Sequence, residues 1–407
     1  MPKINRKKPR VVVAMSGGVD SSVAAAILKK NEYDVIGVFL KFWHDPKCKN
    51  AKENICCSVD AANDARQVAE KLAIPFYVLD ASKEFKKEVV DYYINEYQSG
   101  RTPNPCVMCN KFIKFGWLLK KAKELGANYL ATGHYAKIKD SFSSSQKGVH
   151  SIEAVANATF QWRSRPTFCD SVHSFSLYRA RDAKKDQTYF LWQLNQDQLR
   201  HILFPLGGYT KLEVRNLAKK FGLLTAEKKE SQNVCFIPDG DNEKFLTGYI
   251  NKLNRKGKII DTSGNVLGTH QGLAYYTIGQ RHGLIENSEV KIRKSKFWCE
   301  KNKSRIPPIY VVKLNVDSNL LIVGERKELL SKVLFADNVN WINKPKLIKM
   351  KAKIRYGHKE SDCRVTNITK NKLKVEFMEP QMSVTPGQSV VFYSKNELLG
   401  GGIIQNS

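Results

Sequence analysis

A short glycine turn between a strand-like run and a helix constrains the fold of this chain most. Residues 11–15 are rich in β-branched side chains and lead into Ser16-Gly17-Gly18-Val19-Asp20-Ser21-Ser22. The next stretch, residues 21–30, has the pattern of a helix that opens at Asp20 or Ser21. Glycines let backbone N–H groups approach an anion, and the helix dipole favours negative charge at the same place. The pattern therefore predicts a phosphate-binding turn after the first strand.

The order of segments in the first 135 residues favours a parallel sheet with helices on both faces. Strand-like and helix-like stretches alternate, and each helix-like stretch is long enough to cross back over a sheet. The expected fold class is α/β, with a doubly wound parallel sheet. Strands are predicted at 11–15, 34–40, 76–80 and 129–133, and helices at 21–30, 58–73, 82–98 and 112–125.

The pattern changes twice after this region. Two basic stretches, residues 140–178 and 286–305, are interpreted as loops, and residues 186–224 regain a helical pattern. Beyond residue 307 the hydrophobic residues fall in short alternating runs, with turn-forming residues at 317–319 and 395–397. These runs predict a small C-terminal antiparallel β-barrel, with strands at 309–314, 320–324, 351–356, 373–377 and 390–393.

The glycine turn does not match the two commonest nucleotide-binding loops. The Gly-x4-Gly-Lys-Ser/Thr loop is excluded because no lysine follows the second glycine, and the dinucleotide fingerprint is excluded because the glycines are adjacent. A bare Gly-Gly is most often an ordinary tight turn. The longer Ser-Gly-Gly-x-Asp-Ser motif resembles the pyrophosphate loop of ATP pyrophosphatases, which transfer AMP to a substrate oxygen. The resemblance implies that Ser16, Gly18, Asp20 and Ser21 contact pyrophosphate and its Mg²⁺.

Three of the nine cysteines are candidates for chemistry. The odd number in a long chain implies no disulfide framework. Cys106 and Cys109 follow two prolines, and a helix beginning near Cys109 would favour its thiolate through the helix dipole. Cys106-x2-Cys109 is alternatively half of a zinc site, and Cys235 alternatively packs in a core. A second metal cluster is conceivable at His44, Cys48, Cys56 and Cys57, although loop residues beside the nucleotide are the favoured interpretation.

Six motifs in one order carry a specific resemblance. After the glycine loop come Gly100-Arg101-Thr102-Pro103-Asn104-Pro105, Ala131-Thr132-Gly133-His134-Tyr135, Lys185-Asp186-Gln187-x-Tyr189-Phe190-Leu191, Glu230-Ser231-Gln232-x-x-Cys235-Phe236-Ile237-Pro238 and Gly279-Gln280-Arg281-His282-Gly283. Together they resemble the tRNA-specific 2-thiouridylase family, whose members place sulfur on C2 of the wobble uridine. The resemblance runs from residue 11 to residue 388, apart from the two basic stretches.

The resemblance implies a sulfurtransferase that uses ATP and Mg²⁺. Cys235 matches the cysteine that receives a persulfide from a sulfur carrier or cysteine desulfurase. Cys109 matches the nucleophile that releases the sulfur and closes a transient disulfide with Cys235. The positions matching the ATP site are Ala14, Met15, Ser16, Gly17, Gly18, Val19, Asp20, Ser21, Leu40 and Gly133. The positions matching the tRNA contacts are Asn104, Pro105, His134, Lys185, Asp186, Gln187, Arg355, Tyr356 and Gln388.

The chain departs from the family pattern at Cys106. Many members carry Asp there, a candidate general acid or base, and its replacement places that role in doubt. The substitution also makes Cys106 a third candidate catalytic thiol. Cys106, Cys109 and Cys235 form an alternative ligand set for a [4Fe-4S] cluster and a non-redox sulfur transfer.

The resemblance divides the chain into three expected domains. Residues 1–238 would form the adenylation and thiolation domain with the 140–178 insertion, residues 239–305 a small central tRNA-contacting domain, and residues 306–407 the tRNA-binding β-barrel. Another pyrophosphate-loop enzyme, such as a synthetase with a nitrogen nucleophile, is an alternative, but it needs neither Cys109 nor Cys235. A non-catalytic tRNA-binding protein is a third hypothesis.

The charge of the chain agrees with an RNA partner. Lys and Arg number 67 against 39 Asp and Glu, a formal net charge of +28, which favours a polyanion such as tRNA. No apolar run is long enough for a membrane-spanning helix, so no membrane association is expected. The basic N-terminus superficially matches a signal peptide, but the polar Ser16–Ser22 block interrupts the apolar segment. We expect a cytoplasmic protein.

Overall fold

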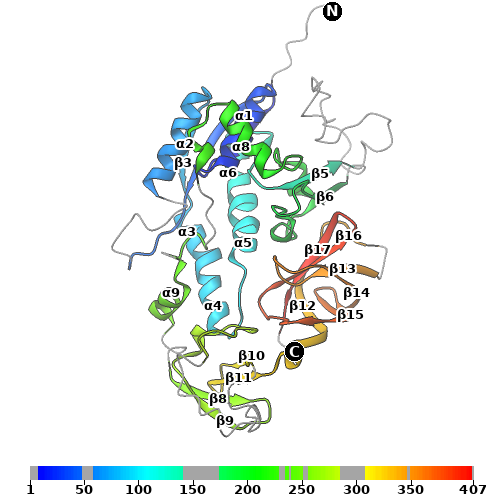
Figure 1. The fold of residues 1–407 in the computed structure, drawn as a ribbon. Helices are drawn as coiled ribbons and strands as arrows, with labels where there is room; N and C mark the ends of the chain where they lie inside the picture. Colours follow the sequence, from blue (N-terminus) through cyan, green and yellow to red (C-terminus); the bar gives the residue numbers. More distant parts are fainter. Residues whose placement is uncertain are drawn as a thin grey trace, which may run out of the picture.

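The computed structural model describes three β-sheets in residues 8–47, 58–140, 174–228, 234–237, 240–250, 255–284, 308–345 and 349–405. Figure 1 shows a parallel sheet with its helices at one end of the molecule and a small second sheet at the other end. A β-barrel lies beside the helices. Within the described residues, no helix is long and apolar enough to cross a membrane.

The first sheet has the predicted doubly wound architecture. Its strand order is β3-β2-β1-β4-β7, and every pairing is parallel. The buried central strand alternates its side chains between two helical layers. Val11 and Val13 pack in one hydrophobic cluster, and Val12 packs in another. The strands are β1 (Arg10–Ala14), β2 (Asp34–Lys41), β3 (Phe76–Asp80), β4 (Tyr129–Ala131) and β7 (Ile202–Leu203).

The helices of this domain confirm most of the predicted ranges. The predicted helix at 82–98 is present, with a π-helical segment (η2) in its middle. Residues 186–224, predicted to be helical throughout, instead combine short helices with irregular backbone and β7. The helical segments of this domain are α1 (Val19–Lys30), α2 (Val59–Lys71), α3 (Ser82–Phe85), η2 (Lys86–Asp91), α4 (Tyr92–Gln98), α5 (Pro105–Met108), η3 (Cys109–Trp117), α6 (Leu118–Glu124), η6 (Thr188–Phe190), α7 (Gln196–Arg200), α8 (Lys211–Lys220) and η7 (Leu224–Glu227), and α9 (Asn242–Tyr249), η10 (Leu273–Tyr275) and η12 (Arg326–Leu329) follow later in the chain.

The helix predicted at 112–125 begins seven residues earlier, at Pro105. Proline suits the first position of a helix, because the N–H it lacks has no partner there and its fixed φ is already helical. Asn104, in extended conformation, is the residue at which the helix starts. The prediction was wrong because the two prolines were interpreted only as extended backbone.

The last residues of the first basic stretch were also misassigned. Residues 175–178, predicted to be loop, lie in β6 (Phe175–Arg179), which forms an antiparallel hairpin with β5 (Ala136–Asp140). The hairpin belongs to the C-terminal sheet, because β6 pairs with β17 (Glu397–Ile404) through Leu177 and Tyr178. The first domain and the barrel therefore share one continuous sheet.

The prediction that the strands at 309–324 belong to the barrel is wrong. They form the predicted hairpin of β10 (Tyr310–Asn315) and β11 (Leu320–Gly324), but β11 pairs in parallel with β8 (Gly257–Asp261), which pairs with β9 (Val266–His270). Local alternation and a turn predict a hairpin, whereas the sheet that it joins depends on long-range packing.

The C-terminal antiparallel barrel is confirmed. Its strands run in the order β12-β15-β14-β13-β16-β17, and the pairing of β12 with β17 closes the circle. Alternate side chains such as Leu373, Val375 and Phe377 of β15 point into its core. The remaining strands are β12 (Leu330–Trp341), β13 (Lys349–Lys353), β14 (Ser361–Thr369), β15 (Lys372–Met382) and β16 (Ser389–Ser394).

A buried segment of the first domain holds the barrel in place. Trp192 is 0% exposed, and its indole N–H donates to Ser389 Oγ over 3.0 Å. The Tyr189 hydroxyl donates to the carbonyl oxygen of Ser389 over 2.9 Å. A Cβ at Gly401 would lie 2.8 Å from the Trp192 ring, so the barrel backbone closely contacts the indole.

We predict that Trp192→Ala strongly destabilises the protein. Removing a fully buried aromatic side chain typically costs about 3–5 kcal/mol, and here it also leaves Ser389 Oγ without its indole donor. Differential scanning calorimetry would measure the fall in melting temperature. Leu212→Ala on α8 is the control, because Leu212 is 70% exposed; an equal effect of both substitutions would contradict the assigned role of Trp192.

Candidate active site

The predicted anion loop is tightly constrained by its own hydrogen bonds. Gly17 has φ +68°, and a Cβ there would lie 2.2 Å from the carbonyl oxygen of Ala61 in α2, so only glycine fits. Gly18 is extended and directly precedes α1. Ser21 Oγ accepts from the Ser16 backbone N–H over 3.1 Å and donates to the Gly18 carbonyl over 3.2 Å. The loop is therefore held by its own hydrogen bonds and by its contact with α2.

Asp20 lies at the centre of a charged contact at this loop. Lys211 Nζ, at the start of α8, contacts the two carboxylate oxygens of Asp20 at 2.7 and 2.8 Å. The Tyr135 hydroxyl donates to the same carboxylate over 2.8 Å. A second lysine, Lys228, donates to the Gly17 carbonyl over 3.0 Å and to Asp64. Two lysines thus reach an anion-binding loop from a distant part of the chain.

Neither lysine was identified from the sequence. Lys211 follows Thr210, which forms a capping box with Glu213, and this Thr-x-x-Glu pattern marks the start of α8. The pattern places Lys211 in the first turn of a helix, but it does not show which loop that turn faces. Only the packing of α8 against α1 brings Lys211 to Asp20.

The other predicted nucleotide positions lie near the loop. Gly133 follows β4, and a Cβ there would lie 2.8 Å from the Ser21 nitrogen and 2.9 Å from the Asp20 carbonyl carbon. Leu40 is buried near the carboxyl end of β2, the strand that pairs with β1. The carboxyl ends of adjacent parallel strands are where ligands bind in open α/β sheets. The structure therefore brings Leu40, Gly133 and the loop to one edge of the sheet.

The predicted effect of the helix dipole falls on Cys106 and not on Cys109. Because α5 begins at Pro105, the exposed Cys106 is the second residue of the helix, and Cys109 lies in the next turn, 7% exposed. The dipole effect fades beyond the first turn, so it acts at the position of Cys106 and not at that of Cys109. The expectation that it activates Cys109 is corrected.

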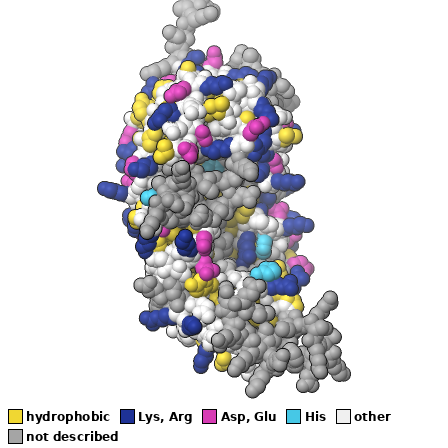
Figure 2. Space-filling view, turned by 60° about the vertical axis from the view of Figure 1, so that its left-hand side comes forward, with side chains coloured by type: hydrophobic (Ala, Val, Ile, Leu, Met, Phe, Trp, Pro, Cys, Tyr) yellow, Lys and Arg dark blue, Asp and Glu magenta, His cyan; other side chains and the backbone are white. Residues whose placement is uncertain are grey.

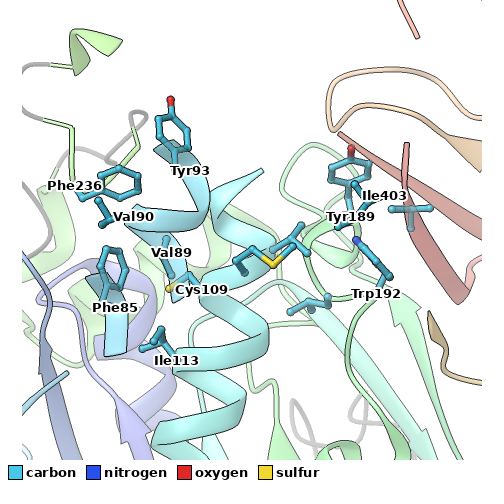
Figure 3. Close-up of a cluster of buried hydrophobic side chains, with 14 of the residues drawn as sticks. Phe85, Val89, Val90, Tyr93, Cys109, Ile113, Tyr189, Trp192, Phe236 and Ile403 are labelled. Carbon is cyan, nitrogen blue, oxygen red and sulfur yellow. The ribbon is translucent and has the colours of Figure 1, made fainter. Parts of the chain in front are cut away.

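Cys109 and the segment that carries Cys235 pack into the same hydrophobic cluster. Figure 3 shows the Cys109 side chain on the side of its helix that faces Phe85 of α3 and Val89 of η2. Phe236 lies on the same side of the cluster. The Phe236 ring lies 5.8 Å from Phe85 and 5.3 Å from Tyr93, measured between ring centroids. Cys235, the neighbour of Phe236, is half-buried and packs against this cluster.

The described residues do not bring the three candidate cysteines together as a metal-ligand group. Cys106, Cys109 and Cys235 are all described, and no group of three His, Cys, Asp or Glu side chains in the described residues could hold a metal ion. The alternative cluster at His44 cannot be compared, because Cys48, Cys56 and Cys57 lie outside the described residues.

The side chains of several predicted tRNA contacts are hydrogen-bonded to other groups of the protein. Asp186 is buried and accepts hydrogen bonds from the Ala180 N–H over 3.1 Å and the Thr188 hydroxyl over 2.8 Å. Gln187 Oε1 accepts from the Tyr135 N–H over 2.9 Å. This motif therefore fixes the local backbone, and Lys185, half-buried, precedes it in the chain.

His134 is also a core residue. Its ring packs near Phe115 and Phe204, with centroids 5.7 and 5.9 Å away, and its Nδ1 lies 2.7 Å from Thr132 Oγ1. Burial, aided by the nearby Lys114 charge, holds the pKa of His134 well below its ordinary value. The ring is therefore neutral at pH 7 and does not offer a cation to phosphate.

An accessible aromatic and cationic surface lies beside the barrel. Tyr356 is 38% exposed, and its ring lies 4.7 Å from that of Phe190, with Lys353 Nζ 5.4 Å above it. Arg355 donates to the Ile278 carbonyl over 3.1 Å and to Thr385, and burial lowers the pKa of its guanidinium. Phe190 and Lys353 were not among the predicted contacts. Aromatic rings beside cations are typical of RNA-binding surfaces.

The remaining predicted contacts lie at the start of α5. Asn104 is half-buried, Pro105 is buried, and Gln388 donates from its amide to the backbone just before them. On the face in Figure 2, Lys and Arg side chains are spread widely, with Asp and Glu between them. Residues 141–173 of the first basic stretch and the whole of the second, residues 286–305, lie outside the described part of the chain.

Three protein-family models match nearly the whole chain. Residues 9–239 match the model of the tRNA methyl transferase HUP domain, residues 243–325 its PRC-barrel domain, and residues 331–404 the aminomethyltransferase β-barrel domain. The tRNA-specific 2-thiouridylase MnmA of Carboxydothermus hydrogenoformans is 45% identical over 100% of this chain and 99% of its own length. The chain belongs to the tRNA-specific 2-thiouridylase family.

Other members of the 2-thiouridylase family match equally far along the chain. The enzyme of Geobacter metallireducens is 43% identical over 98% of this chain and 97% of its own length. Among solved structures, a 4-thiouridine synthetase–RNA complex with bound ATP covers 60% of this chain and 51% of its own, at 17% identity and a TM-score of 0.32. At that TM-score the likeness carries no argument about ligands.

We predict a steep order of thiol reactivity among the described cysteines. Cys106 should react fastest with iodoacetamide at pH 8, because it is exposed and lies at a helix N-terminus. Burial raises the pKa of the Cys363 thiol to about 12, so its alkylation should be roughly a thousandfold slower than that of Cys106. Peptide-resolved mass spectrometry measures each rate. Equal labelling of Cys106 and Cys109 would contradict the assigned helix start.

Proposed function

We propose that this protein is a tRNA-uridine 2-sulfurtransferase that uses ATP to activate the wobble uridine and transfers sulfur from a persulfide on Cys235. The observation that carries the proposal is the packing of Cys109 and the Cys235 segment in one cluster, on the same fold as an ordered anion loop. The identity with 2-thiouridylases along the whole chain supports the same reaction. A synthetase with a nitrogen nucleophile would need neither cysteine.

The first step makes the C2 oxygen a good leaving group. That oxygen attacks the α-phosphorus of ATP, pyrophosphate leaves, and the N3 proton of the uracil is released as the O–P bond forms. We assign the nucleotide to Ala14, Met15, Ser16, Gly17, Gly18, Val19, Asp20, Ser21, Leu40 and Gly133. Backbone N–H groups at the start of α1 and the cations of Lys211 and Lys228 would stabilise the departing pyrophosphate.

A magnesium ion bound with the nucleotide would neutralise phosphate charge. The carboxylate of Asp20 is the chemically suitable ligand in the anion loop, because Mg²⁺ prefers carboxylate and phosphate oxygens. Lys211 and Tyr135 hold the Asp20 carboxylate at the loop, and Asp20 would hold the ion through that carboxylate.

The second step transfers sulfur to C2 and oxidises two cysteines to a disulfide. The terminal sulfur of the Cys235 persulfide attacks C2, and AMP leaves with the former C2 oxygen. The Cys109 thiolate then attacks Cys235 Sγ, and the electron pair of the broken S–S bond passes to the sulfur now on C2. The products are 2-thiouridine and a Cys109–Cys235 disulfide, which an external dithiol must reduce.

The buried position of Cys109 suits this role. A nucleophile that is 7% exposed is shielded from external oxidants, and Cys109 packs in the same hydrophobic cluster as the Cys235 segment. The absence of a suitable metal-ligand group among the described residues gives no support to the iron–sulfur alternative, and no step is assigned to a cluster. Cys106, exposed at the helix start, is the remaining candidate for moving a proton.

We further propose a cytoplasmic enzyme that receives its sulfur from a sulfur carrier or cysteine desulfurase and binds tRNA with a modifiable wobble uridine. Tyr356 and Lys185 are the favoured RNA contacts of the predicted set, because Arg355 is hydrogen-bonded to Ile278 and Thr385. The domain division at residues 238 and 239 also stays a proposal, with the second boundary set between β11 and β12, because β11 pairs with β8.

The function is tested by incubating the protein with unmodified tRNA, ATP, Mg²⁺ and a persulfide donor. Digestion of the tRNA and mass spectrometry should detect 2-thiouridine, with one AMP formed for each sulfur transferred. Formation of AMP without any thiolated nucleoside would contradict the sulfurtransferase assignment and favour another adenylating activity.

We predict that Cys109→Ser and Cys235→Ser each reduce thiolation by roughly a thousandfold or more, because both sulfurs make and break bonds. Binding of tRNA should change by less than about twofold, since affinity comes mainly from phosphate contacts. Cys106→Ala should keep measurable activity under the persulfide route. Substantial thiolation by either serine variant would rule out the two-cysteine scheme.

We predict that Lys211→Ala reduces pyrophosphate release at least tenfold. The substitution removes the cation that contacts Asp20, and a charged hydrogen bond of this kind is typically worth about 1.5–3 kcal/mol. Lys219→Ala, on the same helix, is the matched control because the Lys219 side chain is 61% exposed and pairs with Glu227. If both variants release pyrophosphate at the same rate, Lys211 has no role in the step.

A further inference from the structure

A turn of the β-barrel lies directly on the loop that precedes the cysteine-bearing helix. The Thr102 backbone N–H donates to the Pro386 carbonyl over 2.8 Å. The Gln388 side-chain amide donates back to the Thr102 carbonyl over 2.9 Å and to the Pro103 carbonyl over 3.3 Å. Both backbone polar groups of Thr102 are therefore bonded to a single turn of another domain.

The fit between the turn and the loop is close. Gly387 has φ +89°, and a Cβ there would lie 2.8–3.0 Å from the backbone atoms of Thr102. A residue other than glycine would push the two backbones apart and would also strain the turn. The contact is thus built at the level of the backbone and does not depend on flexible side chains alone.

The turn itself is held firmly within the barrel. The Gly387 N–H donates to the Ile404 carbonyl, and the Ile404 N–H donates to the Gln388 carbonyl, each over 2.8 Å. The barrel is in turn fixed to the first domain by the buried Trp192. Residues 386–388 therefore have a defined position relative to the parallel sheet.

The loop at residues 101–104, which the turn contacts, has no side-chain cap where it meets α5. Arg101 is anchored by its ion pair with the buried Glu96, a contact that raises the pKa of Arg101. Asn104, at the start of α5, makes no side-chain capping hydrogen bond. A helix without such a cap frays more readily, so the first turn of α5 depends on the backbone before it being held.

We propose that Gln388 is a positioning residue that clamps residues 101–104 and thereby fixes the first turn of α5, which contains Cys106 and directly precedes Cys109. This inference rests on the proposed function for the role of the cysteines, but the clamp itself is a property of the protein without RNA. It differs from the expected role of Gln388 as a tRNA contact. It also makes the RNA-binding barrel a structural part of the thiolation site.

The test compares Gln388→Ala with the wild-type full-length protein, without ATP, tRNA or sulfur donor. We expect hydrogen–deuterium exchange in the peptide that contains Thr102 to rise roughly tenfold, because the clamped backbone opens more often. We expect Cys109 alkylation to rise by a similar factor as the first turn of α5 frays. Gln381→Ala is the matched control, since the Gln381 amide bonds to Ser361 and Glu379 within the barrel.

Thiolation kinetics supply a second readout. A clamp predicts a lower kcat for Gln388→Ala with tRNA affinity within about twofold of wild type, whereas an RNA contact predicts weaker tRNA binding. Gly387→Ala should reproduce the exchange and alkylation changes through its clash with Thr102. Unchanged exchange and unchanged Cys109 alkylation in Gln388→Ala would overturn the proposal, whatever the tRNA affinity. Because these two measurements need no reaction, they decide the clamp even if the proposed function fails.

Discussion

The burial of Tyr189 and Trp192 between the first domain and the barrel is the contact on which the arrangement of the molecule depends. Both side chains are almost fully enclosed, and both donate hydrogen bonds to the same barrel residue, Ser389. An interface with large aromatic groups and satisfied polar atoms resists the relative motion expected of loosely joined domains. The contacts of the barrel with the cysteine-bearing loop are possible because this interface keeps the two domains in register.

The charged groups that the structure describes at the anion loop are paired within the protein. The carboxylate of Asp20 is neutralised by Lys211, and the Gly17 carbonyl is covered by Lys228. Both cations therefore lie at the predicted anion loop, and each already has an oxygen partner within the protein. These contacts avoid the cost of desolvating isolated charges at the loop.

The features that the sequence predicted are those encoded within a few neighbouring residues. The glycine loop, the strand–helix alternation and the turns at 317–319 and 395–397 depend on local backbone preferences, and the structure contains all of them. The features that were missed depend on distant partners. Nothing near Lys211 indicates that it faces Asp20, and nothing in the run at 320–324 indicates that its neighbour is β8. The helix start at Pro105 was locally encoded, but it was hidden by the tendency of prolines to mark extended chain.

The hairpin of β5 and β6 has a consequence for how this fold tolerates change. Asp140 and Phe175 are paired directly across the two strands, so the two ends of the connection between β5 and β6 lie next to each other. The ends of whatever connects them are already held together, and the entropy of closing such a connection grows only slowly with its length. The connection can therefore lengthen, shorten or be exchanged in evolution while the sheet shared by the two domains keeps its register.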